Sequence, residues 1–146
     1  MKILVKIIIL VILFSSSSLT KVFSQDKIKL GLLVPISGEF SEIGKSIIKS
    51  TLLAVNKIDN SLIEIIPKDT MSNPDVTYEK AKELREAGVK IVIGPVFNNN
   101  LIKLEELNDM TFLSLTNKII DNPKNIISVG INAISQLNTI AKFQKD

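Results

Sequence analysis

Short apolar runs alternate with segments of helical periodicity from residue 27 to the end of the chain. The run 27–35 is nearly continuous in apolar side chains, as expected of a strand buried on both faces, and a helical pattern follows it over 41–58. Further strands are expected at 62–67, 90–94, 111–115 and 125–129, and further helices at 74–87, 99–108 and 133–144. Strands and helices that alternate at these lengths predict an α/β fold, a three-layer parallel sheet with helices on both faces.

Two of the later helices show which side chains should face the sheet. Leu101, Leu104 and Leu107 fall on one side of the helix expected over 99–108. In the last helix, the side chains expected to point inward are Ile134, Leu137 and Ala141.

The first 24 residues have the pattern of a signal peptide rather than of a folded element. Lys2 and Lys6 precede an unbroken apolar run over 7–14, and the small residue Ser24 suggests a cut before Gln25. The apolar run is shorter than the stretch of about 20 residues that spans a bilayer. Export to the periplasm is therefore expected, with a retained membrane anchor as the alternative. No Cys stands at the cut to carry a lipid anchor.

Composition excludes several classes of chemistry. The chain contains no His and no Cys, so neither a Ser-His-Asp nor a Cys-His site can form, and ordinary zinc, haem and iron–sulfur sites are also excluded. Loss of the signal peptide would remove Lys2, Lys6 and Lys21, leaving 15 of the 18 basic residues against 15 acidic ones. A neutral chain gives no reason to expect a nucleic-acid partner, and we expect no cofactor or metal.

Two motifs resemble catalytic ones without meeting their requirements. Five residues separate Gly38 from Gly44, whereas a phosphate-binding P-loop needs four, and neither 90–94 nor 111–115 supplies an Asp for magnesium. Lys45 is therefore interpreted as a solvated residue in the first turn of its helix. Acidic side chains on the helix 74–87 alternate with basic ones, which is typical of a solvated helix face rather than of an acid–base pair. We predict that the protein is not an enzyme.

The loops carry a resemblance to a known family. The segment 32–38, followed by Gly44 and the helix that ends near Asn56, resembles the opening of type I periplasmic binding proteins of the Leu/Ile/Val-binding group. The similarity continues, in order and spacing, through Asp69-Thr70, Asn73-Pro74, the helix 81–84 and Ile91 to Pro95. This resemblance implies a single lobe of that fold, with strand order 2-1-3-4-5 and the strand 27–35 at its centre.

Two loops differ from those of the amino-acid binders. Residues 96–100 read Val-Phe-Asn-Asn-Asn where amino-acid binders tend to carry serines, and 113–118 lacks their pattern of small residues and threonine. Both loops look closer to the penicillin-binding protein activator branch, which regulates peptidoglycan synthesis by binding a synthase. The resemblance thus implies two alternatives for the partners: a small polar ligand such as an amino acid together with an ABC permease, or a peptidoglycan synthase.

The binding site is expected beyond the carboxyl ends of the strands, where helix N-termini present unpaired N–H groups. Six residues fall on this rim: Ser37, Gly38, Asn98, Asn99, Thr116 and Asn117. The resemblance implies that Asn98 and Thr116 contact a polar or zwitterionic ligand, whereas helix capping and turn closure are the alternative roles. Because family members hold ligand between two lobes and this sequence ends at Asp146, we expect residues 25–146 to form the N-terminal lobe of a truncated protein.

Overall fold

A five-stranded parallel sheet forms the centre of the protein in a computed structural model, which describes residues 27–58, 61–117, 123–130 and 133–144. The strands are β1 (Ile28–Val34), β2 (Ile63–Asp69), β3 (Ile91–Ile93), β4 (Thr111–Ser114) and β5 (Ile126–Ser128). Their order is β2-β1-β3-β4-β5, and every neighbouring pair is parallel. The predicted fold class and strand order are confirmed, and β1 lies between β2 and β3 as expected.

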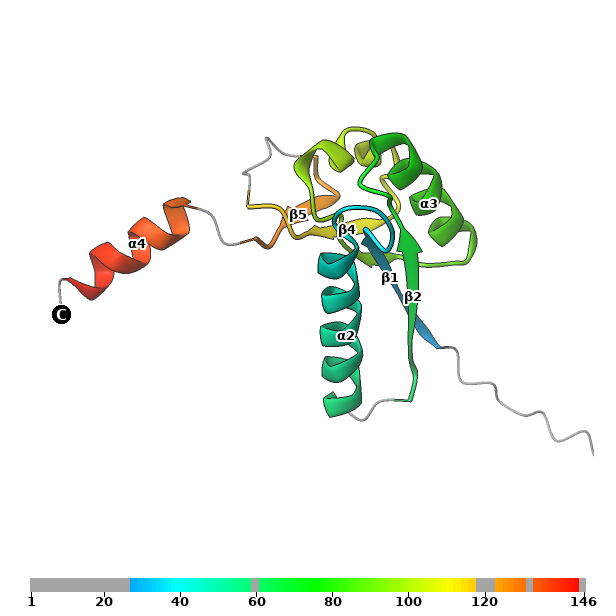
Figure 1. The fold of residues 1–146 in the computed structure, drawn as a ribbon, viewed down its shortest axis with the longest axis horizontal. Helices are drawn as coiled ribbons and strands as arrows, with labels where there is room; N and C mark the ends of the chain where they lie inside the picture. The colour runs from blue at the N-terminus through cyan, green and yellow to red at the C-terminus, as the bar shows by residue number, and fades with distance from the viewer. Residues whose placement is uncertain (1–26, 59–60, 118–122, 131–132, 145–146) are drawn as a thin grey trace, which may run out of the picture.

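The central strand is buried because helices approach the sheet from both sides (Figure 1). Leu32, Leu33 and Val34 are fully buried, and successive side chains of a strand point to opposite faces. Leu33 belongs to the main core with Leu84 of α3 (Pro74–Glu86). The helix α2 (Ser41–Ile58) lies against the other face, where it contacts β1 and β2.

The predicted helix over 99–108 is wrong. Two short 3₁₀ segments replace it, η1 (Asn98–Leu101) and η2 (Leu104–Glu106). The side chains of Leu101, Leu104 and Leu107 are nevertheless buried together in the core, as expected. Side chains three residues apart share a face in a 3₁₀ turn as well as in an α-helix, so the spacing of the leucines is compatible with both forms.

The expected inward face of the last helix is also wrong. The helix α4 (Ala133–Phe143) forms, but it carries no buried residue, and Ile134 and Leu137 are 56% and 65% exposed. Figure 1 shows α4 extending away from the sheet, so its apolar side chains have no surface to pack against. Within the described residues, no helix is long and apolar enough to cross a membrane. The expected signal peptide lies outside the described residues.

Candidate functional site

The loop after β1 is held in place by a carboxylate at the end of β2. Asp69 Oδ1 accepts a hydrogen bond from the backbone N–H of Ile36 at 2.8 Å and another from that of Met71 at 2.9 Å. Partial burial raises the pKa of the Asp69 carboxyl, but hydrogen bonds from the Ser37 side chain and from these N–H groups outweigh it, so the pKa lies below its ordinary value. The carboxylate therefore fixes the loop that carries Ser37 and Gly38, both exposed.

The same carboxylate shapes the turn after β2. Met71 and Ser72 both have left-handed φ angles, 49° and 56°, and the Met71 N–H is one of the groups that Asp69 binds. Two residues later Asn73 caps α3, because its Oδ1 accepts from the N–H groups of Asp75 and Val76 at 2.9 and 3.0 Å. Sequence reasoning gave Asp69 no role in the site, although a carboxylate near the carboxyl end of a strand was a usable signal.

The loop after β3 turns closely over the sheet at a glycine. Gly94 has a φ of +109°, and a Cβ there would lie 2.2 Å from the carbonyl oxygen of Leu33. Only glycine allows this approach. The following Pro95 carbonyl then accepts a hydrogen bond from the Leu115 N–H at 3.0 Å, which ties the β3 loop to the β4 loop.

An aromatic pair joins the loops after β1 and β3. The rings of Phe40 and Phe97 have centroids 4.8 Å apart and planes tilted by 59°, within the range of favourable aromatic pairs. The strand order reverses between β1 and β3, and ligands of open α/β sheets bind at such a switch point. The pair was not predicted, because no sequence pattern indicated that the segments 38–44 and 96–100 bring these two rings together.

The structure thus brings the predicted rim residues to one edge of the sheet but buries one of them. Ser37, Gly38, Asn99 and Asn117 are exposed and Asn98 is partly exposed, on loops that follow β1, β3 and β4. Thr116 is only 5% exposed. Its carbonyl accepts from the Ser128 Oγ at 3.0 Å, and a Cβ on Gly130 would lie 2.0 Å from that same oxygen. These contacts give Thr116 a part in holding the β4 loop against β5.

One further asparagine on this edge is buried. Asn100 is 2% exposed, and neither its side-chain oxygen nor its nitrogen has a hydrogen-bond partner among the described residues. A buried amide without partners is costly, which distinguishes Asn100 from its exposed neighbour Asn99.

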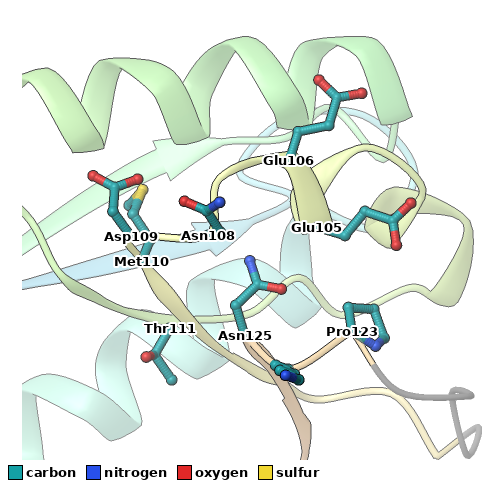
Figure 2. A pocket seen from close by; sticks show the side chains of 9 residues that line it. Glu105, Glu106, Asn108, Asp109, Met110, Thr111, Pro123 and Asn125 are labelled. Carbon is teal, nitrogen blue, oxygen red and sulfur yellow. The ribbon is translucent and has the colours of Figure 1, made fainter.

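A hollow of about 570 Å³ lies at the opposite, amino-terminal edge of the sheet (Figure 2). Two of the three acidic residues that line it have partners: Asp109 binds Arg85 at 2.9 Å and Lys90 at 3.3 Å, and Glu106 accepts from the Tyr78 hydroxyl at 2.8 Å. The hydrogen bond from Arg85 holds the pKa of the Asp109 carboxyl below its ordinary value.

Figure 2 shows Asn125 among the side chains of this hollow. Its amide donates to the carbonyls of Leu104 and Leu107 at 3.0 and 3.1 Å. The side chains of this hollow therefore serve packing between elements, and the rim at the carboxyl edge remains the better candidate for binding.

The charged helix face matches its prediction. On α3, Lys82 pairs with Glu79 at 3.1 Å, and Glu83 pairs with Lys68 of β2 at 2.6 Å. Near the P-loop-like sequence, Lys45 pairs with Glu42 at 2.7 Å and is largely exposed. These contacts are ordinary surface ion pairs.

An open parallel sheet with polar loops gathered at its carboxyl edge defines the class of this protein as an open α/β lobe. The family model described as periplasmic binding protein matches residues 27–144. The chain therefore belongs to the periplasmic binding protein family. The comparison with curated protein sequences found no match.

Several solved structures share the fold of this chain. The C-domain of LpoA from Haemophilus influenzae, a regulator of PBP1A, is 24% identical with a TM-score of 0.62, over 80% of this chain and 38% of that one. The leucine-binding protein LivK from Thermotoga maritima is 18% identical with a TM-score of 0.64, over 80% of this chain and 36% of that one.

A third structure, an ABC transporter solute-binding protein from Rhodopseudomonas palustris in complex with 3,4-dihydroxybenzoic acid, is 26% identical with a TM-score of 0.59. The match covers 63% of this chain and 28% of that one. The chain thus spans well under half the length of each of these three relatives.

Proposed function

We propose that the chain is the N-terminal lobe of an extracytoplasmic solute-binding protein that serves an ABC importer of the branched-chain amino-acid type. Membership of the periplasmic binding protein family supports this class. The observation that carries the proposal is the rim itself, where exposed polar residues from three separate loops meet at one edge of the sheet. A periplasmic location and a non-catalytic role follow from the same proposal.

The rim offers two kinds of contact to a small polar ligand. Ser37 and Asn98 present a hydroxyl and an amide, and the Phe40–Phe97 pair between their loops presents an apolar surface with Phe40 37% exposed. The Asp69 carboxylate is engaged with backbone N–H groups, so it holds the loop rather than binding the ligand. A second lobe would close over this surface, exclude water and supply the remaining contacts.

A second candidate function is regulation of a peptidoglycan synthase. The match to the LpoA C-domain, a regulator of PBP1A, extends over 80% of this chain, the same share as the match to the leucine-binding protein LivK, so both functions have a structural neighbour of equal coverage. Large side chains at Phe97, Asn98 and Asn99 also occupy the loop where amino-acid binders tend to be small. Under this alternative the rim contacts a protein.

Calorimetry separates the two functions. Residues 25–146 alone should bind leucine, isoleucine and 3,4-dihydroxybenzoate with dissociation constants no lower than roughly 1 mM, which corresponds to a binding free energy of about 4 kcal/mol. The reason is that a single rim leaves its polar groups hydrated. A version of the protein that carries a second lobe should bind at least one of these ligands with a micromolar dissociation constant. If the two-lobed protein binds none of them but retains a purified peptidoglycan synthase, the transport proposal is wrong and the regulatory one holds.

A further inference from the structure

The carboxyl edge of the sheet carries more acidic than basic charge in the described part of the chain. Two lysines near this edge already have carboxylate partners. Lys45 binds Glu42 in the first turn of α2, and Lys103 binds Asp75 in the first turn of α3, both at 2.7 Å. Each of these pairs is neutral, so neither lysine offers a free positive charge to a ligand at the rim.

Two carboxylates on the same edge have no cationic partner among the described residues. Asp69 accepts hydrogen bonds from neutral backbone N–H groups, and Glu39 is exposed and makes neither an ion pair nor a hydrogen bond. Lys68 precedes Asp69 in β2 but extends to Glu83, in the second half of α3, at 2.6 Å. A surface of one charge sign attracts ligands of the opposite sign, so this rim favours a cation.

The loop that carries Glu39 also presents an aromatic ring to solvent. Phe40 follows Glu39 directly, is 37% exposed, and is held by its contact with Phe97. The face of an aromatic ring carries partial negative charge and attracts organic cations, quaternary ammonium groups above all. A metal ion would instead need a cluster of oxygen ligands, and the described residues contain no group of three acidic side chains that could hold one. The rim therefore favours an organic cation.

We propose that this lobe binds its solute through an organic ammonium group, which the ring of Phe40 and the carboxylate of Glu39 hold at the loop after β1. The inference rests on the proposed function, because it requires the rim to bind a solute. It narrows the ligand to compounds with a positively charged nitrogen, such as amino acids and alkylated amines, and excludes acids without an amine. Ser37 and Asn98 then bind the remaining polar part of the solute.

Three probes of similar shape and different charge test the proposal. Choline carries a trimethylammonium group, 3,3-dimethylbutan-1-ol has carbon in place of its nitrogen, and 3,3-dimethylbutanoate is an anionic analogue. Each probe is titrated into the isotope-labelled chain from Gln25 onward, which contains every described residue, and the backbone amide resonances are followed by NMR. Choline should shift the amides of residues 38–40 and 97–98 with a dissociation constant at least about fivefold lower than that of the neutral analogue, and the anion should bind most weakly.

Substitutions separate the contribution of the charge from that of the ring. Glu39→Gln and Phe40→Leu should each reduce the preference for choline over the neutral analogue by at least about twofold. The matched control is Glu105→Gln, which removes an exposed carboxylate at the opposite edge of the sheet and should leave the preference unchanged. The dispersion of each amide spectrum reports whether the variant keeps its fold.

The outcomes distinguish this inference from the proposed function. A preference for choline below about fivefold, or an equal loss of preference in Glu39→Gln and Glu105→Gln, would overturn the inference. Binding of 3,4-dihydroxybenzoate, which has no amine, by the two-lobed protein would support solute binding and still overturn the ammonium site. Failure of the proposed function is seen separately, as a two-lobed protein that binds no solute in calorimetry.

Discussion

The Asp69 carboxylate should stabilise the fold in a manner that depends on pH. Its two hydrogen bonds to the backbone N–H groups of Ile36 and Met71 are short, at 2.8 and 2.9 Å. Hydrogen bonds to charged groups contribute about 1.5–3 kcal/mol each, and partial exposure of Asp69 places these at the lower end. We expect Asp69→Ala to lower the free energy of unfolding by about 3 kcal/mol, and Asp69→Asn, which keeps an acceptor oxygen, by about 1 kcal/mol.

The sign of the pH dependence follows from the lowered pKa. The folded carboxyl has a pKa below its ordinary value of 3.8, so its contribution is complete above that value and is lost as pH falls through the folded pKa. Urea unfolding of the wild-type chain and of Asp69→Asn, followed by circular dichroism from about pH 7 to about pH 3, should show a stability difference that shrinks at the acid end.

A control on the same rim isolates the effect. Glu39 is exposed, so Glu39→Gln should change stability by no more than about 0.5 kcal/mol. If Asp69→Asn differs from wild type by the same amount at every pH, the carboxylate charge does not hold the loop and the reasoning fails.

Three further predictions concern the loops and the N-terminus. Gly94→Ala should destabilise the fold by about 2–4 kcal/mol in thermal unfolding, because its Cβ would meet the Leu33 carbonyl and its φ is left-handed; a change below about 0.5 kcal/mol would contradict this. Intact-mass analysis of a periplasmic fraction should find a product that begins at Gln25, and recovery only as an unprocessed membrane protein would refute export. In a two-lobed version, Asn98→Leu should weaken ligand binding by about 1–3 kcal/mol by calorimetry, and unchanged affinity would return Asn98 to a structural role.

The sheet could be predicted from the sequence because buried strands have a simple signature. The apolar run of β1 and the short runs of β3 and β4 needed no tertiary information. The end of β2 was predicted less accurately, because the expected strand ends at Pro67 and the observed one continues to Asp69. Proline is tolerated there because β2 is an edge strand with a single partner, so the missing N–H removes no essential bond.

The segments that follow β3 and β5 were harder to predict. The periodicity of Leu101, Leu104 and Leu107 was read as α-helical, although a spacing of three equally suits the 3₁₀ turns observed. The helix α4 could be predicted but its placement could not, because an apolar face indicates that a helix should be buried without indicating where. The rim residues could be placed on one edge by topology alone, whereas the burial of Thr116 depends on a contact with Gly130 that no local pattern encodes.

The central position of the first strand also sets the order in which the sheet can assemble. β1 is synthesised before both of its neighbours, so its backbone groups stay unpaired until β2 and then β3 have been made. β5 joins last, at the edge, and pairs only with β4 over Ile126–Ser128. Amide hydrogen exchange should therefore be slowest in β1 and fastest in β5, with local opening that starts at the β5 edge and spreads inward.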